Sequence, residues 1–204
     1  MIPNPITFPL EAHKPRIMPS NPGRILLAVG RLGEEKRFDW LIEAFAELAG
    51  RFTDWSLVIV GEGICRAKLE KQAEVLGLAR RVSLPGAVGN IGEWYESADL
   101  YVMTSRFEGF PNTLAEALSY GLPAVSVDCD TGPRDIIRHG VDGLLVPPND
   151  QWALVDALAS LMANEDLRDR YGQRAKEAVQ RFALERVAEM WENLFRQVMV
   201  NGSR

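Results

Sequence analysis

The chain has 204 residues, 47% of them hydrophobic and 25% charged, and its formal net charge at pH 7 is −5. This is an ordinary globular composition, long enough for one well-packed core and short for two domains. The acidic balance argues against nucleic acid as a partner, and no apolar run reaches the roughly 18 residues that a membrane-spanning helix needs.

The two cysteines and the N-terminal sequence argue for a protein that stays inside the cell. Cys65 and Cys129 lie far apart and lack the spacing of a disulfide framework or of a metal site. The first residues also lack the pattern of a signal peptide. We therefore expect reduced thiols, no bound metal and a cytoplasmic location.

Residues 1–22 contain six of the twelve prolines, at positions 3, 5, 9, 15, 19 and 22. No helix tolerates that density, because proline lacks the amide hydrogen and clashes with the preceding turn. The segment is therefore predicted to be a linker or an extended tail. A folded domain is expected over residues 23–185, followed by a C-terminal helix over residues 186–204.

From Arg24 onward, short apolar runs alternate with helical patterns. Near-continuous apolar strands are buried on both faces, and helical crossovers between them imply a parallel sheet. The sequence thus predicts an α/β fold, a doubly wound parallel sheet of the Rossmann type, whose ligands bind at the carboxyl ends of the strands. The expected strands are Ile25–Gly30, Leu57–Gly61, Val82–Leu84, a run from Leu100, Ala124–Val127 and Leu144–Val146, and the expected helices contain Trp40–Leu48, Leu69–Leu76, Ile91–Ser97, Glu116, Arg134–Ile137, Trp152–Met162 and Gln173–Val200.

The segment Ser105–Gly121 joins one predicted strand to the next through a loop and a helix. Pro111 suits the first helical position, and Asn112 or Thr113 can cap nearby amides. A loop that opens a helix presents unpaired N–H groups and the positive end of the helix dipole, which together suit a phosphate. Gly109 lets a ligand approach the backbone closely. The other amides on offer belong to Phe110, Asn112, Thr113 and Leu114.

Two carboxylates frame this segment, Glu108 before the helix and Glu116 inside it, with seven residues between them. Carboxylates repel phosphate, but an ionised carboxylate accepts two O–H bonds at once and therefore suits vicinal hydroxyls. A ligand with a central phosphate and hydroxyls at both ends could bond to the N–H groups and to both carboxylates. A nucleotide sugar has this arrangement. The alternative is an amphipathic helix with solvated acids.

A second loop follows the first predicted strand and begins at Gly30. It has neither the G-x-G-x-x-G nor the Walker pattern, so dinucleotide and P-loop interpretations fail. Arg31 can fork a diphosphate, and Lys36 can add a point charge. The alternative is that these cations pair with Glu34 or Glu35 at the surface.

Three further segments carry weaker signals. Gly61-Glu62-Gly63 lacks the third glycine of a dinucleotide fingerprint and is interpreted as a turn before a helix. The small, apolar loop Leu84–Gly89 either packs against a flat base or is a plain turn. Asp128 and Asp130 have D-x-D spacing, a rival metal signal, while Asp130 or Thr131 is the expected cap of the next helix.

The run SRFEGFPNTLAEALSYGLPAV and the G-R-x-x-x-x-K loop together resemble retaining glycosyltransferases of the GT-B fold, more narrowly the bacterial family 4 group, or glycosyl transferases group 1. The resemblance spans about residues 21–195 and covers only the C-terminal, donor-binding domain of that fold. MIPNPI is similar to the segment that links the two domains. The resemblance implies metal-independent transfer of a sugar, with retention, from a nucleotide diphosphate sugar such as a UDP-sugar to a glycan or lipid-linked acceptor.

The resemblance also implies roles for the matching residues. Glu116 holds the ribose diol, and Glu108 holds hydroxyls of the transferred sugar. Arg31 and Lys36 neutralise the leaving diphosphate together with the helix amides, so Glu108, Arg31 and Lys36 are the expected catalytic groups. The expected substrate-binding residues are Gly30, Val88 near the nucleobase, Gly109, Phe110, Asn112, Thr113, Leu114 and Glu116.

Two other interpretations stay open, a non-catalytic nucleotide-sugar-binding module and a GT-B epimerase or phosphorylase relative. The E-G-F-P and G-R-x-x-x-x-K motifs favour the transferase, acting in cell-surface polysaccharide biosynthesis. The resemblance implies a missing N-terminal domain with the acceptor site, and peripheral contact with the inner face of the membrane through that half is a further alternative. We expect the chain alone to bind donor without transferring sugar, and to expose apolar surface near Trp191.

Overall fold

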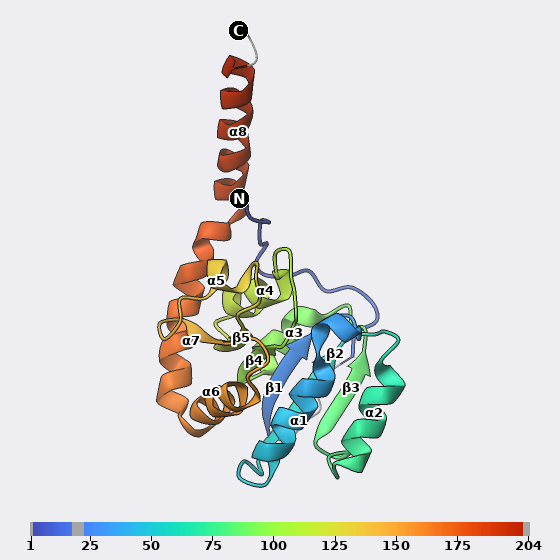
Figure 1. The fold of residues 1–204 in the computed structure, drawn as a ribbon. Coiled ribbons are helices and arrows are strands. Elements are labelled where there is room, and N and C mark those ends of the chain that lie inside the picture. The colour runs from blue at the N-terminus through green and yellow to red at the C-terminus, as the bar shows by residue number, and fades with distance from the viewer. Residues whose placement is uncertain (1, 18–22, 202–204) are drawn as a thin grey trace.

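The computed structural model describes residues 2–17 and 23–201, in which six strands form a single parallel sheet (Figure 1). The strand order is β3-β2-β1-β4-β5-β6, so the chain starts at the centre, winds to one edge and then to the other. This is the predicted doubly wound topology. The elements are β1 (Arg24–Val29), η1 (Glu34–Lys36), α1 (Phe38–Ala49), β2 (Trp55–Val60), α2 (Arg66–Val75), β3 (Val82–Gly86), α3 (Ile91–Ser97), β4 (Leu100–Met103), α4 (Asn112–Ser119), β5 (Ala124–Val127), α5 (Pro133–Ile136), β6 (Gly143–Val146), α6 (Gln151–Ala163), α7 (Glu165–Val179), η2 (Gln180–Phe182) and α8 (Leu184–Asn201).

The central strand β1 is apolar on both faces, as a buried parallel strand must be. Ile25 and Leu27 point into one core cluster, while Leu26 and Ala28 point into the other. This alternation follows from the two-residue repeat of a strand. Leu26 lies opposite Leu57 of β2, which fixes the register at the middle of the sheet.

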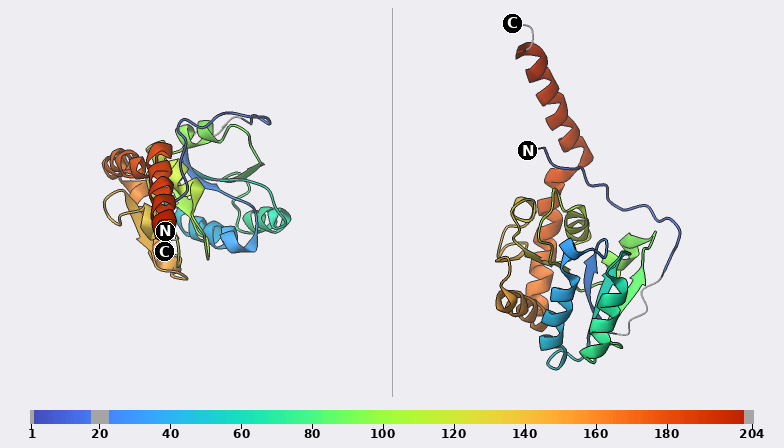
Figure 2. Two further views of the ribbon diagram at one scale, coloured as in Figure 1. Left: turned by 90° about the horizontal axis from the view of Figure 1, so that it is seen from above. Right: turned by 45° about the vertical axis from the view of Figure 1, so that its right-hand side comes forward.

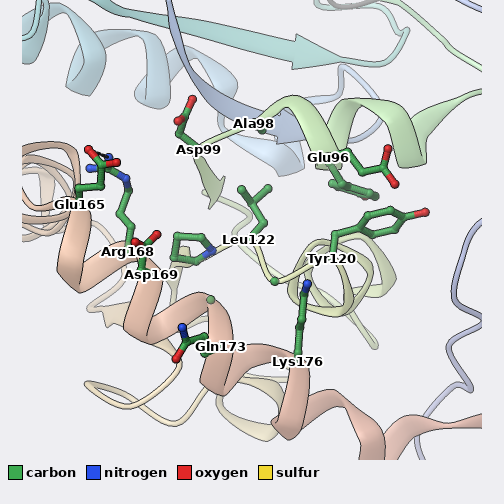
Figure 3. Close-up of a pocket in the computed structure, with 14 residues that line it drawn as sticks. Glu96, Ala98, Asp99, Tyr120, Leu122, Glu165, Arg168, Asp169, Gln173 and Lys176 are labelled. Carbon is green, nitrogen blue, oxygen red and sulfur yellow. Dashed lines mark ion pairs between the residues drawn. The ribbon is translucent and has the colours of Figure 1, made fainter.

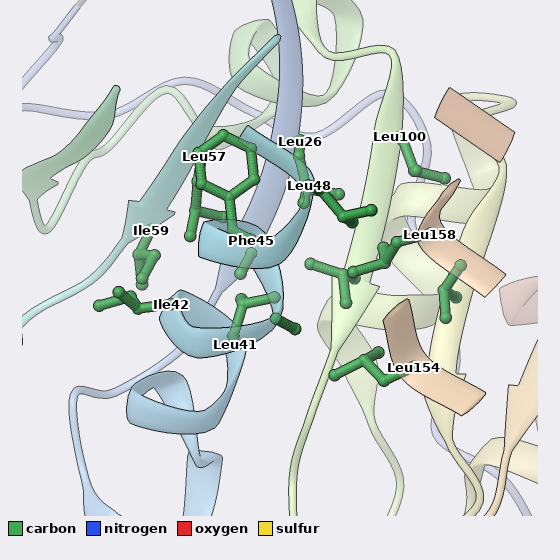
Figure 4. Packing of buried hydrophobic residues seen from close by; sticks show 14 of the residues in the cluster. Leu26, Leu41, Ile42, Phe45, Leu48, Leu57, Ile59, Leu100, Leu154 and Leu158 are labelled. Atoms are coloured by element: carbon green, nitrogen blue, oxygen red, sulfur yellow. The ribbon is translucent and has the colours of Figure 1, made fainter. Parts of the chain in front are cut away.

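Helices cover both faces of the sheet and complete the two core clusters. On one face α1 and α6 contribute Leu41, Phe45, Leu154 and Leu158, all with 0% exposure (Figure 4). On the other face α3, α4 and α7 pack over β1, β4 and β5. Each buried leucine or phenylalanine stabilises the fold by about 1.5–3 kcal/mol relative to an exposed one.

The predicted helix Ile91–Ser97 and strand Ala124–Val127 are confirmed to the residue. The single closing helix predicted over residues 173–200 is wrong, because α7, η2 and α8 occupy this part of the chain. Asn164 caps the start of α7, because its side chain accepts a hydrogen bond from the amide of Leu167 (2.9 Å). The break falls where Phe182 is buried and Ala183 takes an extended conformation, with ψ of 144°.

Residues 2–17 contain no helix, as the proline density predicts, and they pack along the surface of the domain. The amide of Ile6 donates to the Phe182 carbonyl (2.8 Å). Ile17 exchanges hydrogen bonds with the side chain of Asn90, each of 3.1 Å. Parts of the predicted N-terminal tail and C-terminal helix, residues 1, 18–22 and 202–204, lie outside the described residues.

The last helix, α8, extends away from the rest of the domain (Figures 1 and 2). Val187 near its start is buried, but Trp191 is 44% exposed and stacks on Phe195 with ring centroids 5.8 Å apart. The expected apolar surface near Trp191 is therefore confirmed. Among the described side chains of α8, the large exposed apolar ones are those of Leu184, Met190, Trp191, Leu194, Phe195, Val198 and Met199.

Candidate functional site

Two loops meet at the carboxyl edge of the sheet, one after β1 and the other after β4. They are adjacent because β1 and β4 are neighbouring parallel strands. The Thr104 hydroxyl donates to the Lys36 carbonyl (2.8 Å), and the Arg106 amide donates to the Glu35 carbonyl (2.8 Å). These bonds hold the two loops together and bring their charged side chains to one place.

Lys36 and Glu108, two of the predicted catalytic residues, contact each other directly. The ammonium donates to Oε1 of Glu108 (2.7 Å), and the Ser105 hydroxyl donates to the same oxygen (2.6 Å). The Lys36 and Glu108 side chains are only 20% and 13% exposed. The Lys36 side chain lies over Gly30, where an added Cβ would come within 3.3 Å of Lys36 Cε. A ligand that offers an anion and a hydroxyl here satisfies both charged groups.

Arg31, the third predicted catalytic residue, lies at the rim of this site. Its side chain is 76% exposed and donates to Oε1 of Glu35 at 2.6 and 3.1 Å. The hydrogen bond from Arg31 lowers the pKa of the Glu35 carboxyl. The structure therefore shows the pairing with Glu35 that the sequence left open, and the contact of Arg31 with phosphate stays a prediction.

The predictions for the start of α4 need two corrections. The helix begins at Asn112, so Pro111 precedes it and is not its first residue. Neither predicted side chain caps the helix: Asn112 Oδ1 accepts from the Asn4 amide group (3.1 Å), and the Thr113 hydroxyl accepts from the Tyr101 hydroxyl (2.9 Å). Both oxygens are used in contacts with distant parts of the chain, which local sequence does not reveal.

The backbone amides around the start of α4 divide into two groups, those bonded within the chain and those left free. Asn112 donates to the carbonyl two residues earlier (2.9 Å) and Leu114 to the carbonyl three residues earlier (3.1 Å), so the expectation that these two amides are on offer is wrong. Within residues 2–17 and 23–201, the amides of Gly109, Phe110 and Thr113 have no protein partner. The N–H groups that could bind a phosphate here are therefore these three, fewer than the sequence predicts.

Glu116 lies on α4 in surroundings unlike those of Glu108. Its Oε2 accepts from the hydroxyl of Tyr95 (3.0 Å), which is 1% exposed. Partial burial raises the pKa of the Glu116 carboxyl, and the Tyr95 hydrogen bond opposes this rise. Among the described side chains, no lysine or arginine pairs with Glu116. Such a carboxylate suits neutral hydroxyl donors.

The remaining candidates lie on either side of these loops. Val88 is partly buried against the core, and its contact with a base stays a prediction. Asp128 forms a two-point ion pair with Arg134 (2.9 and 3.0 Å). Gly132 precedes α5 without any side-chain cap, so the expected cap from Asp130 or Thr131 is wrong. In the described part of the chain, no group of three or more His, Cys, Asp or Glu side chains is arranged to hold a metal ion.

A pocket of about 360 Å³ lies at the opposite edge of the sheet, where β4 and β5 begin (Figure 3). Asp99 and Pro123 immediately precede these strands, and Arg168 and Lys176 of α7 line the other side. Arg168 donates to the carbonyls of Leu161 (2.7 Å) and of the next residue, both in the last turn of α6. The pocket therefore lies at the amino ends of β4 and β5, away from the loops at the carboxyl edge.

The sequence did not identify Ser105 or Tyr95. Ser105 contacts a carboxylate three residues later, so a hydroxyl directly after a strand was an available signal. Tyr95 and Glu116 are 21 residues apart on different helices. No local pattern predicts their contact, which depends on how α3 and α4 pack.

Comparison with known proteins places this chain in a family. The profile described as Glycosyl transferases group 1 matches residues 11–178. The chain is 39% identical over 199 residues to an exopolysaccharide phosphotransferase of Streptomyces coelicolor, covering 97% of this chain and 21% of that protein. It is 33% identical over 169 residues to the amylovoran biosynthesis glycosyltransferase AmsD of Erwinia amylovora, covering 83% of this chain and 47% of that protein.

Solved structures agree with this placement. TarM of S. aureus, in complex with fondaparinux, alpha-GlcNAc-glycerol and UDP, has a TM-score of 0.81 and 28% identity over 91% of this chain and 38% of its own. The C-terminal domain of a glycosyl transferase group 1 family protein of Francisella tularensis has a TM-score of 0.73 and 25% identity, covering 80% of this chain and 88% of its own.

The chain belongs to the glycosyl transferases group 1 family and has the fold of the C-terminal domain of a GT-B glycosyltransferase. The predicted family and fold class are confirmed. The chain spans about a fifth to a half of the length of these two curated relatives. None of the helices in the described residues combines the length and apolarity needed to cross a membrane.

Proposed function

We propose that this chain is the donor-binding half of a retaining glycosyltransferase that uses a UDP-sugar and needs no metal ion for binding the donor. The diphosphate is neutralised by Lys36, by the rim residue Arg31 and by the free amides around the start of α4. Glu108 accepts hydrogen bonds from the transferred sugar, and Glu116 accepts them from the ribose diol. The acceptor is a hydroxyl of a glycan or of a lipid-linked saccharide, held by a further domain.

The observation that carries this proposal is the meeting of Lys36 and Glu108 at 2.7 Å beside the start of α4. A cation and a carboxylate at one point suit a ligand whose hydroxyls lie on the carbon atoms next to its phosphate ester, as in a sugar phosphate. In the transition state the leaving diphosphate gains charge, and a fixed ammonium with amide donors stabilises that charge.

The names of similar proteins support the ligand and the pathway. TarM was solved with UDP and a GlcNAc glycoside. One relative is named an exopolysaccharide phosphotransferase, and another is named an amylovoran biosynthesis glycosyltransferase. We infer a role in bacterial cell-surface polysaccharide synthesis, in the cytoplasm and at the inner face of the membrane. The same relatives motivate a glycan or lipid-linked acceptor.

Calorimetry with UDP and a panel of UDP-sugars tests the proposal, in EDTA and again in Mg²⁺. We expect binding in EDTA with a Kd between about 1 μM and 1 mM, roughly −8 to −4 kcal/mol. Asp128→Ala is the matched control for the D-x-D alternative and should leave the affinity unchanged. Binding that requires Mg²⁺ and is lost in Asp128→Ala would show that the charge assignment is wrong.

A further inference from the structure

Beneath α4 lies a pair of buried tyrosines that the proposed function does not use. Tyr95 of α3 and Tyr101 of β4 are 1% and 0% exposed, with ring centroids 6.3 Å apart. A hydroxyl this deep needs a hydrogen-bond partner. Both hydroxyls find their partners on α4, the helix that opens the candidate site.

The two hydroxyls contact different groups on α4. The Tyr101 hydroxyl donates to Oγ1 of Thr113 (2.9 Å). The Tyr95 hydroxyl lies 3.0 Å from Glu116 Oε2 and 3.3 Å from the Thr113 carbonyl. Only Tyr95 thus reaches the carboxylate, although both rings belong to the same packed layer.

We propose that Tyr95 is a positioning residue, which holds the Glu116 carboxylate in the orientation that receives the ribose hydroxyls of the donor. This inference rests on the proposed function of Glu116. Tyr95 is buried and does not touch the donor itself, so it acts through Glu116.

The geometry explains why Glu116 needs such a partner. A glutamate side chain has several rotatable bonds, and fixing it in advance avoids an entropic cost when the ligand binds. No cation fixes Glu116 in the described residues, in contrast to Glu108 with its Lys36 ammonium. Tyr95 holds Oε2, and Oε1 has no partner among the described side chains, so it is available to a hydroxyl.

The test compares Tyr95→Phe with Tyr101→Phe, because both variants remove one buried hydroxyl from the same layer. The probes are UDP and 2′,3′-dideoxy-UDP, which carry the same diphosphate but differ in the ribose diol. The ratio of their Kd values measures the diol contact alone. Circular dichroism and thermal melting check that both variants are folded.

We expect Tyr95→Phe to weaken UDP about 3- to 10-fold, the effect of one net hydrogen bond, without affecting the dideoxy compound. Tyr101→Phe should change the ratio less than about 2-fold. If wild type does not distinguish the two probes, the proposed role of Glu116 fails and this inference fails with it. If wild type distinguishes them and Tyr95→Phe does so equally well, the inference alone is overturned.

The pH dependence of the ratio provides a readout that a purely structural role would not move. Glu116 must be ionised to accept the diol, so the preference for UDP is lost as the pH falls through the Glu116 pKa. The Tyr95 hydrogen bond lowers that pKa, so Tyr95→Phe should move the midpoint to higher pH. The titratable groups around Glu116 and its two tyrosines are Tyr95, Tyr101, Tyr120, which interacts with Tyr95, and Glu108, which interacts with Tyr101. Burial raises the pKa of Tyr95 and of Tyr101, so both stay neutral.

A second substitution at position 95 tests the same hydrogen bond if Tyr95→Phe does not fold. Placing 3-fluorotyrosine at position 95 alone retains the ring and the hydroxyl but makes the phenol a stronger donor. The midpoint of the UDP preference should then move to lower pH, opposite to Tyr95→Phe. An unchanged midpoint in this variant would overturn the inference by itself.

Discussion

Glu108 and Glu116 belong to one short motif, yet their surroundings differ in charge. Glu108 lies in a loop beside the Lys36 ammonium at 2.7 Å and the Ser105 hydroxyl at 2.6 Å. Glu116 lies over buried phenols, with the Tyr95 hydroxyl at 3.0 Å. The negative charge of Glu108 is balanced by the positive charge of Lys36. Among the described side chains, Glu116 is stabilised by a hydrogen bond from the neutral Tyr95 hydroxyl.

This difference separates the two ends of the proposed donor site. A carboxylate that forms an ion pair with a cation can lie next to a phosphate group, because the ion pair has no net charge before the ligand binds. A carboxylate without a cation must stay away from phosphate and accept neutral hydroxyls. The proposed order of sugar, diphosphate and ribose along the loops follows from this distribution of charge.

Lys36→Met should have the largest effect, because it removes the proposed phosphate ligand and leaves Glu108 without a cation. We expect UDP affinity to fall about 10- to 100-fold, or about 1.5–3 kcal/mol. Stability should fall by about 1–2 kcal/mol, since the pair is only 20% and 13% exposed. Calorimetry and urea unfolding measure the two quantities.

The double variant Lys36→Met with Glu108→Gln tests the physical reason for that loss of stability. Removing both charges leaves no uncompensated carboxylate, so the double variant should be more stable than Lys36→Met alone. A double variant that is less stable would show that Glu108 is stabilised by something other than Lys36. UDP binding should remain weak in both variants.

Glu116→Gln should weaken UDP and UDP-sugars alike, by about 10-fold, because both ligands carry the ribose diol. The same change should stabilise the free protein slightly at neutral pH. Burial raises the pKa of Glu116, so the folded state binds the proton more tightly than the unfolded state. Wild-type stability relative to the variant should therefore rise as the pH falls from the raised folded pKa to the unfolded value of about 4.3.

Unfolding in urea at several pH values measures this effect, with Glu108→Gln as the matched variant from the cation-paired site. If the two variants lose UDP affinity equally, the proposal that Glu116 binds the ribose and Glu108 the transferred sugar is wrong. A Glu116→Gln variant with less stability than wild type at every pH would show that the Tyr95 bond outweighs the cost of burial.

Much of the fold follows from the sequence because the strands are continuous apolar runs and their order obeys simple rules. Lys36 and Glu108 are 72 residues apart, yet both were placed at one sheet edge because each follows a strand. Their direct contact was not predicted. The rule that the carboxyl ends of parallel strands meet at one edge shows that two residues are near each other, but not that they form an ion pair. The strand Ala124–Val127 was predicted to the residue because Pro123 and the polar Asp128 bound it.

The errors arose where distant segments decide the local conformation. The break before α8 depends on burial of Phe182 and on its contact with Ile6, which no helical pattern contains. The caps expected from Asn112 and Thr113 are absent because Asn4 and Tyr101 engage these side chains. Tyr95 was overlooked because its partner Glu116 lies on another helix.

Glu108→Gln should spare UDP and weaken only sugar-bearing ligands, by about 5-fold or more. The amide still fills the same space, and Lys36 stays free to contact phosphate. A panel of UDP and UDP-sugars titrated against this variant measures the difference. If UDP itself binds much more weakly, Glu108 serves the diphosphate end through Lys36 and does not contact the sugar.

Arg31→Gln should have the smallest effect, because Arg31 is 76% exposed and already paired with Glu35. An exposed cation must give up its partner to contact phosphate, and its field is screened by salt. We therefore expect UDP affinity to fall only about 2- to 5-fold, with the difference shrinking between 50 and 500 mM salt. Glu35→Gln is the matched control and should leave UDP binding unchanged or slightly stronger, because it releases Arg31. A loss in Arg31→Gln as large as that in Lys36→Met, and insensitive to salt, would show that Arg31 turns inward in the complex and belongs to the same half-buried charge cluster as Lys36.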